Sequence, residues 1–338
     1  MTIIPYKGVP IFNSDGTFRK EDDIVQGRSF SSNLTKMLKH MNKLEDIQRG
    51  KPPSPVMAHI SLTNACNLTC SFCCFANRDI SEKMPTETVL KALDSFKAIG
   101  ITGVEFTGGG EPSIHPDFKQ IVRYAKDLGF SLGICTNAAR FGMDRPIKKD
   151  IVELFDWVRM GMYGFYEGYD YDLRVFEGTN CKPSAAYVWD ENLATSNNPN
   201  ITGDWTDVKN KRIKSKKFQT TDNFVRMLDW VEENKIPCRI AFNAIKDVKE
   251  TAKDIETIRD IIAEYENDRG RKLQSAFLSD FNFKGERRND HCYMHMVKPF
   301  LFTDGYIYAC PSAELSIENN YNYVPESQFA VCDVDGII

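Results

Sequence analysis

The feature that most constrains the fold is a regular alternation of short apolar runs and amphipathic helical runs between residues 56 and 283. The predicted strands are Met57–Leu62, Gly103–Thr107, Ser131–Thr136, Trp157–Met162, Cys238–Asn243 and Ser275–Phe281. The predicted helices between them are Thr86–Ile99, Pro116–Leu128, Pro146–Phe155, Thr221–Asn234 and Val248–Asn267. Such alternation produces parallel strands joined by right-handed crossovers. The expected fold is therefore α/β, an open partial (β/α)6 barrel of the TIM type.

The same pattern divides the chain into three parts. Residues 1–55 form an N-terminal extension that ends in the proline-rich connector Lys51–Pro55. Residues 56–283 are the predicted barrel, and residues 284–338 are a C-terminal extension with a predicted β-hairpin at Thr303-Asp304-Gly305. An aromatic-rich segment at about 163–217 is too long for an ordinary connection. We predict an insertion there, either a surface excursion or a lid that contacts substrate.

Composition argues against several classes of protein. A formal net charge of −4 gives no basic field of the kind that a dedicated nucleic-acid binder needs. No run approaches the ~20 apolar residues of a transmembrane helix, and the first residues lack the pattern of a signal peptide. We therefore expect a cytoplasmic protein without a membrane partner. In that reducing compartment, the ten cysteines are expected to be metal ligands, catalytic thiols or buried residues rather than disulfides.

Three cysteines follow the first predicted strand at a spacing that suits one metal cluster. Cys66, Cys70 and Cys73 form a C-x3-C-x2-C motif. Electron-transfer clusters are usually held by four cysteines, so three thiolates would leave one iron of a cubane open. The loop begins where active sites of parallel barrels gather, at the carboxyl end of a strand. A zinc site or incidental cysteines are the alternatives, and Cys74 is interpreted as a packed thiol.

A glycine-rich segment, Gly108-Gly109-Gly110-Glu111-Pro112, follows the second predicted strand. Glycines let the backbone approach a ligand closely. The strand-end carbonyls and the Glu111 carboxylate are candidate acceptors for an ammonium group. The alternative is a tight turn between strand and helix. No GxGxxG fingerprint occurs, so nicotinamide binding is not supported.

These motifs resemble those of the radical S-adenosylmethionine (SAM) superfamily. The matching residues are Cys66, Cys70, Phe72 and Cys73 for the cluster motif, and Gly108, Gly109, Gly110 and Glu111 for the motif that receives the amino group of SAM. The resemblance implies a 4Fe-4S cluster that cleaves SAM reductively to a 5′-deoxyadenosyl radical, which abstracts hydrogen from a substrate. It also implies an external electron donor of the flavodoxin or ferredoxin type.

Weaker matches fall at the ends of later strands. Thr136 and Asn137 lie where relatives carry polar residues near the SAM ribose. Arg159 is a candidate partner of the SAM carboxylate or a member of a structural ion pair, and Asn243 is a candidate adenosine contact. Relatives often have serine at the position of Gly161, so its absence puts the usual ribose contact in doubt.

The C-terminal cysteines resemble the opening of a SPASM or twitch extension. Cys292 precedes the predicted hairpin, and Gly305 and Cys310 form a G-x4-C signature. The resemblance implies an auxiliary 4Fe-4S cluster, although only Cys332 follows where full extensions carry several cysteines. The candidates for a fourth ligand are His291, His295 and Cys181. The alternative is three unligated thiols in a small β extension.

Cys135 and Cys238 lie within apolar strands, where buried core residues are the favoured interpretation. The alternative is a thiol that returns hydrogen to a substrate radical, as in radical epimerases. The resemblance favours an enzyme that acts on a peptide or on a polar small molecule or nucleotide. Modification of a nucleic acid is less favoured and depends on the basic run 209–217. A non-catalytic zinc or iron–sulfur protein is the alternative from another class.

Overall fold

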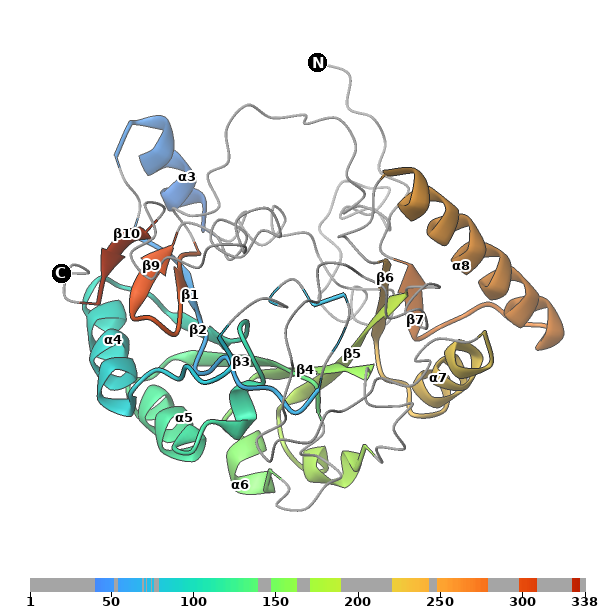
Figure 1. Cartoon of the computed structure of the whole chain (residues 1–338), viewed down its shortest axis with the longest axis horizontal. Helices are drawn as coiled ribbons and strands as arrows, with labels where there is room; N and C mark the ends of the chain where they lie inside the picture. The colour runs from blue at the N-terminus through green and yellow to red at the C-terminus, as the bar shows by residue number, and fades with distance from the viewer. Residues whose placement is uncertain are drawn as a thin grey trace.

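One continuous open sheet of ten strands runs through the part of the chain that the computed structural model describes, in the order β10-β9-β8-β1-β2-β3-β4-β5-β6-β7 (Figure 1). The described residues are 40–51, 54–68, 70, 72–73, 75, 79–138, 147–162, 171–189, 221–242, 248–278, 298–308 and 330–334. Strands β1 to β7 are parallel to their neighbours and form the curved body of the sheet. They are β1 (Met57–Ile60), β2 (Gly103–Phe106), β3 (Ser131–Thr136), β4 (Trp157–Gly161), β5 (Lys182–Trp189), β6 (Cys238–Phe242) and β7 (Ala276–Leu278).

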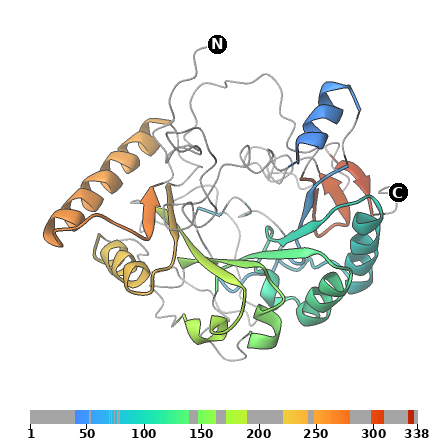
Figure 2. The same ribbon diagram turned by 180° about the vertical axis from the view of Figure 1, so that it is seen from behind.

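Helices cover the outer, convex face of this sheet (Figures 1 and 2). They are α4 (Thr86–Ala98), α5 (Phe118–Asp127), α6 (Lys149–Val152), α7 (Thr221–Glu233) and α8 (Val248–Asp268). Short helical turns η2 (Pro112–Ile114) and η5 (Leu173–Phe176) follow β2 and β4, and α3 (Met41–Gln48) precedes β1. The prediction of an α/β partial barrel is confirmed, because strands alternate with covering helices and the sheet does not close. None of the described helices has the length and apolar character that crossing a membrane requires.

Strand β5 corrects the predicted organisation. Residues 182–189 were assigned to an insertion at 163–217, but they pair in parallel with β4 on one side and β6 on the other. The prediction failed because Pro183 and two alanines give this strand a low β-propensity. Its alternation is nonetheless clear in the structure, since Ala185, Tyr187 and Trp189 are buried. The body of the sheet therefore has one more parallel strand than the six predicted.

The C-terminal segment continues the same sheet. Strand β8 (Phe300–Leu301) pairs in parallel with β1. Strands β9 (Tyr306–Tyr308) and β10 (Ala330–Asp333) then add antiparallel neighbours. The predicted hairpin at Thr303-Asp304-Gly305 is confirmed, and Gly305 takes the positive φ of 83° that this turn needs. Within the structure, β1 is consequently an inner strand with a partner on each side.

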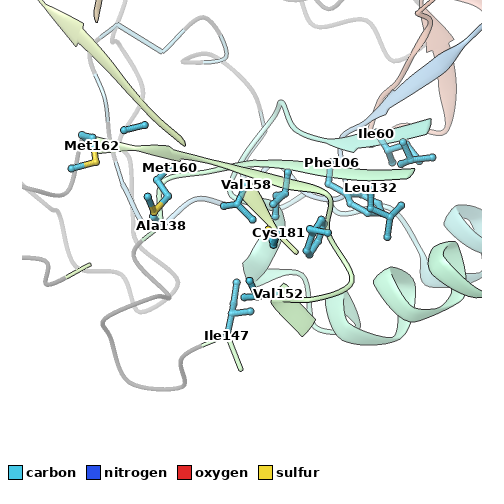
Figure 3. Packing of buried hydrophobic residues seen from close by; sticks show 14 of the residues in the cluster. Ile60, Phe106, Leu132, Ala138, Ile147, Val152, Val158, Met160, Met162 and Cys181 are labelled. Carbon is cyan, nitrogen blue, oxygen red and sulfur yellow. The ribbon is translucent and has the colours of Figure 1, made fainter. Parts of the chain in front are cut away.

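The two faces of the parallel strands differ in chemistry. Buried apolar side chains such as Ile60, Phe106 and Val158 point toward the helices and form the core (Figure 3). Strand side chains alternate between faces, so His59 and Glu105 lie on the opposite, inner face. A closed barrel of this type fills its interior with branched apolar side chains. The inner face of this open sheet instead carries polar and charged groups.

Gly133 of β3 leaves room on the inner face for the neighbouring indole ring. A Cβ atom at Gly133 would lie 2.2 Å from Cε2 and Cζ2 of Trp157. We expect Gly133→Ala to lower the free energy of unfolding by about 1–3 kcal/mol through overpacking. Urea denaturation measures this change. The control is Gly103→Ala, whose new Cβ would meet its nearest neighbour, Met57 Cβ, at an ordinary 3.5 Å. An equal loss of unfolding free energy in both variants would contradict the close packing of Gly133 against Trp157.

Candidate functional site

The loop that carries Cys66, Cys70 and Cys73 begins directly after β1 and is pinned at its base. The Asn64 N–H donates to the Glu82 carbonyl at 2.9 Å, and the Met84 N–H donates to the Leu62 carbonyl at 3.0 Å. The Asn64 side chain also donates to the Glu82 carboxylate at 3.0 Å. The segment that returns from the loop therefore fixes the loop's starting point.

The glycine turn after β2 lies against the backbone that leads into Cys66. The Gly110 N–H donates to the Thr63 carbonyl at 2.7 Å, and the Glu111 N–H donates to the Ala65 carbonyl at 2.8 Å. A Cβ atom at Gly110 would lie 1.7 Å from the Ala65 carbonyl oxygen. Neither backbone can yield at that distance, so the turn requires glycine. The missing side chain at Gly110 therefore lets the backbone of the turn contact the backbone that leads into the cysteine loop.

Glu111 connects this turn to the end of β3. Its buried carboxylate accepts hydrogen bonds from the Ser113 N–H at 3.1 Å, the Ser113 hydroxyl at 2.6 Å, the Thr136 hydroxyl at 2.6 Å and the Asn137 N–H at 2.7 Å. Burial raises the pKa of Glu111, and these donors oppose that shift. These four donors hold the carboxylate between the turn and the end of β3. Its expected contact with the ammonium group of SAM, like that of the carbonyls at the end of β2, stays a prediction.

Asn137, directly after β3, lies beside the cysteine loop, and the predicted place of Thr136 and Asn137 near the SAM ribose stays a prediction. The Asn137 Nδ2 donates to Asn67 Oδ1 at 2.7 Å and lies 3.7 Å from Cys66 Sγ. The Leu68 N–H is a second donor to Cys66 Sγ, at 3.5 Å. Donors directed at a sulfur favour its thiolate form, which is the form that binds metal.

The three cysteines form no disulfide and are partly accessible. Cys70 and Cys73 share a turn in which the Cys73 N–H donates to the Cys70 carbonyl at 3.0 Å, and Phe72 is half-buried between them. No three His, Cys, Asp or Glu side chains of the described residues converge in a metal-binding arrangement. Metal binding and the ordering of ligands are coupled, so the assignment of these cysteines as ligands stays a prediction.

Two observations fit a cluster and its ligand at this loop. Thiolates are the soft donors that iron–sulfur clusters use. The Ser61 hydroxyl is buried beneath Gly109, and it has no hydrogen-bond partner within the described structure. A buried polar atom in this state indicates a missing partner such as a ligand or water. The residues present therefore fit the group that the motif implies.

The C-terminal hairpin packs against the cysteine loop through an aromatic cluster of Phe75, Phe300, Phe302 and Tyr308. Phe75, two residues after Cys73, stacks on Phe302 with ring centroids 6.4 Å apart and an interplanar angle of 14°. The Thr303 hydroxyl also donates to the Glu82 carboxylate at 3.3 Å. The loop is thus held between the return segment and a hairpin more than two hundred residues away in sequence.

A second polar group, which we call the Glu105 cluster, occupies the inner face of the sheet. Its members are Glu105, His59, Cys135, Arg159 and Lys298. The Glu105 carboxylate lies 2.7 Å from His59 Nε2, 3.3 Å from Lys298 Nζ and 3.8 Å from Arg159 Nη2. The Cys135 thiol donates to it at 3.0 Å, and Arg159 Nη2 lies 2.7 Å from the Cys135 sulfur.

The charges in this cluster follow from burial and pairing. Burial alone would raise the pKa of Glu105, but His59, Lys298 and Arg159 bring it well below its usual value. Burial lowers the pKa of His59, so the neutral ring can donate from Nε2 to the carboxylate. Burial raises the pKa of Cys135 to about 12, so this thiol keeps its proton at neutral pH.

Sequence analysis missed Glu105 and Lys298. An available signal was a charged residue inside an otherwise apolar central strand, since such residues are rarely buried without partners. Lys298 had no comparable signal, because it reaches the cluster only through the pairing of β8 with β1. Arg159 is placed with Glu105 and Cys135, which supports its interpretation as a member of an ion-pair network.

The remaining predicted residues separate into three groups. Cys238 lies in the apolar core, 3.8 Å from the Met227 sulfur and on the helix side of β6, which does not suit a hydrogen donor. Cys181 is buried in the same core (Figure 3), and its role as a fourth auxiliary ligand stays a prediction. Cys332 lies in β10 opposite Ile307. Outside the described residues fall Cys74, Asn243, His291, Cys292, His295 and Cys310.

The contact between the glycine turn and the cysteine loop generates a prediction. Gly110→Ala should push the turn away from Ala65 and displace the start of the loop. We expect iron affinity after anaerobic reconstitution to fall by roughly 10- to 100-fold, the loss typical when groups that support metal ligands change. Iron analysis, with circular dichroism to verify folding, measures the effect. Gly103→Ala is the matched control, and equal iron loading of the two variants would refute the role given to Gly110.

Comparisons with known proteins agree with this geometry. The family model described as Radical SAM superfamily matches residues 60–168. An S-adenosylmethionine-dependent nucleotide dehydratase of Selenomonas ruminantium is 32% identical over 98 residues, which are 29% of this chain and 35% of that protein. The chain thus spans about a third of that curated relative.

Two solved structures share the fold over most of the chain. Streptococcus suis SuiB bound to S-adenosylmethionine superposes with a TM-score of 0.52 and 18% identity, covering 91% of this chain and 74% of that one. SuiB bound to its precursor peptide SuiA gives a TM-score of 0.51 and 16% identity, with coverage of 91% and 72%.

Proposed function

From the radical SAM superfamily domain that the chain carries, we infer that the protein is an enzyme that cleaves SAM reductively and abstracts hydrogen from a substrate. One observation carries this inference. The loop with Cys66, Cys70 and Cys73 is held at the carboxyl ends of β1 to β3 by the glycine turn and by Glu111. That is the edge of a parallel sheet at which active sites form.

Cys66, Cys70 and Cys73 would hold a 4Fe-4S cluster whose fourth iron stays free of protein thiolate. When bound, such a cluster supplies one electron to SAM, and the cleavage yields methionine and a 5′-deoxyadenosyl radical that abstracts hydrogen from a C–H bond. The electron must come from outside the chain, for which we propose a flavodoxin- or ferredoxin-type protein. A reducing cytoplasmic setting would suit both the cluster and the free thiols.

The chain's own residues bind, orient and shield in this proposal. The absence of side chains at Gly109 and Gly110 brings the backbone of the turn close to the loop. Asn137 directs its amide toward Cys66, and Glu111 fixes the backbone of Asn137. A preformed polar frame of this kind orients a ligand without reorganisation when the reaction begins.

We propose that residues 56–283 act as the catalytic barrel and that residues 284–338 are a SPASM- or twitch-like extension. The substrate is proposed to be a peptide or a polar small molecule such as a nucleotide. The name of the Selenomonas ruminantium relative includes a nucleotide, and SuiB has been seen with a peptide. The polar inner face of the sheet suits a polar substrate in either case.

Removing one cysteine ligand tests the assignment of the first cluster. After anaerobic reconstitution, wild-type protein should hold about four irons in this cluster and release 5′-deoxyadenosine when given SAM and dithionite. Cys66→Ala should lose that product to the limit of mass-spectrometric detection, because the open-iron cluster would not assemble. Cys238→Ala, a core cysteine, should keep it. A colourless protein that holds zinc, or product release from Cys66→Ala, would exclude the proposal.

The auxiliary cluster has its own test. We expect the double variant Cys292→Ala/Cys310→Ala to lose about four of roughly eight irons while retaining the first cluster. Iron and sulfide counting measures the loss, and cleavage of SAM reports on the first cluster. A wild-type count near four, unchanged in the double variant, would show that the C-terminal cysteines bind no cluster.

A further inference from the structure

We propose that Ser61 is a positioning residue for SAM, whose buried hydroxyl accepts a hydrogen bond from the Gly109 N–H when the glycine turn binds the amino group of the cofactor. This inference rests on the proposed function and deepens it by naming a residue outside the two motifs that shapes the SAM site. It is carried by a buried hydroxyl without a partner, by an unpinned half of the glycine turn, and by the fixed geometry of the peptide unit.

The first observation is the state of the Ser61 hydroxyl. Its neighbour Ile60 points into the core (Figure 3), and side chains alternate along a strand, so Ser61 lies on the inner face of the sheet. Ser61 is 0% exposed, and its Oγ has no hydrogen-bond partner among the described residues. A buried hydroxyl in this state is costly. We therefore expect its partner to arrive in another state of the site.

The second observation is that the glycine turn is pinned in one half only. The N–H groups of Gly110 and Glu111 are held by the carbonyls of the cysteine loop's first residues. Within the part of the chain that the structure describes, the backbone groups of Gly108 and Gly109 make no hydrogen bond. Both residues have a positive φ, of 81° and 51°, which glycine adopts without steric cost. The peptide unit between them is therefore free to turn while Gly110 stays in place.

The third observation is the chemistry beneath Gly109. The three atoms nearest to a Cβ at this position would all be oxygens, namely Ser61 Oγ, Asn64 Oδ1 and the Thr63 carbonyl, within 2.9 Å. The Thr63 carbonyl already accepts the Gly110 N–H at 2.7 Å. A position lined by oxygens suits an N–H donor, and the Gly109 N–H is an adjacent donor that makes no bond within the described structure.

Peptide geometry connects this donor to the cofactor. In a planar trans peptide unit, the C=O and the N–H point in opposite directions. When the Gly109 N–H points down to Ser61, the Gly108 carbonyl must point away from it, toward the side on which the motif is expected to receive the amino group of SAM. The hydroxyl would thus fix the peptide plane in the orientation that presents a carbonyl to an ammonium group.

Ser61→Ala tests the inference through two effects that a structural role would not combine. In anaerobically reconstituted protein, calorimetry should show SAM binding weakened roughly tenfold, because the bound state loses a hydrogen bond. Without SAM, the variant should melt at a temperature no lower than that of wild type, since alanine removes a hydroxyl that has no partner. A purely structural serine would lower the melting temperature.

Two other serines are matched controls. Ser95→Ala changes a buried serine of α4 and should leave SAM affinity unchanged. Ser113→Ala removes a hydroxyl that donates to Glu111 at 2.6 Å, so it should lower the melting temperature without SAM. Iron counting verifies that the proteins compared carry the same amount of cluster.

Hydrogen exchange, followed by mass spectrometry at residue resolution, reports on the proposed bond itself. SAM should slow exchange of the Gly109 amide in wild type, because the N–H becomes hydrogen-bonded, and should not slow it in Ser61→Ala. This measurement needs no turnover and no substrate.

Four results would overturn the inference: equal SAM affinities in wild type and Ser61→Ala, equal protection of the Gly109 amide, a lower melting temperature of the SAM-free variant, or loss of iron in place of loss of SAM affinity. The last result would assign Ser61 to the cysteine loop. Wild-type protein that binds no SAM and releases no 5′-deoxyadenosine would overturn the proposed function, and this inference with it. Wild-type binding and cleavage of SAM with equal affinity in the variant would remove the role of Ser61 alone.

Discussion

The contact between two stretches of backbone, at Gly110 and Ala65, is the constraint on which the site depends. Two hydrogen bonds join the glycine turn to the segment before Cys66, and only a residue without a side chain permits them. Glu111 then transmits the position of this turn to Thr136 and Asn137. Three loops that follow three different strands are thereby fixed as one rigid unit. The chemistry proposed for the site needs this rigidity, because misplacing a reacting group by an ångström is costly.

The open sheet explains why charge is tolerated at the centre of the fold. A closed barrel would have to fill its interior with apolar side chains, but an inner face that stays partly accessible keeps ionised groups in contact with water. Glu105 pairs with Arg159 and Lys298 on this inner face. The apolar core lies instead between the sheet and the helices (Figure 3). The apolar core and the paired charges thus occupy opposite faces of the same strands.

Sequence alone predicted the features that depend on local pattern. Most strands and helices were found because their periodicity is strong, and the cysteine and glycine motifs were found because their spacing is short. Strand β5 was missed since a proline and two alanines hide a strand that only its neighbours stabilise. The partners of Glu111 and the position of Lys298 were beyond prediction, because each depends on contacts between segments distant in the chain.

The pairing of β8 with β1 has a consequence for the order of assembly. Strand β1 emerges early from the ribosome, yet Phe300 and Leu301 complete its second edge only after some two hundred and forty further residues. Until then, Phe75 has no aromatic partners from the hairpin, and the loop before it is tethered on one side only. Pairing over so long a separation is slow. The proposed cluster would accordingly be inserted only after β8 has paired with β1.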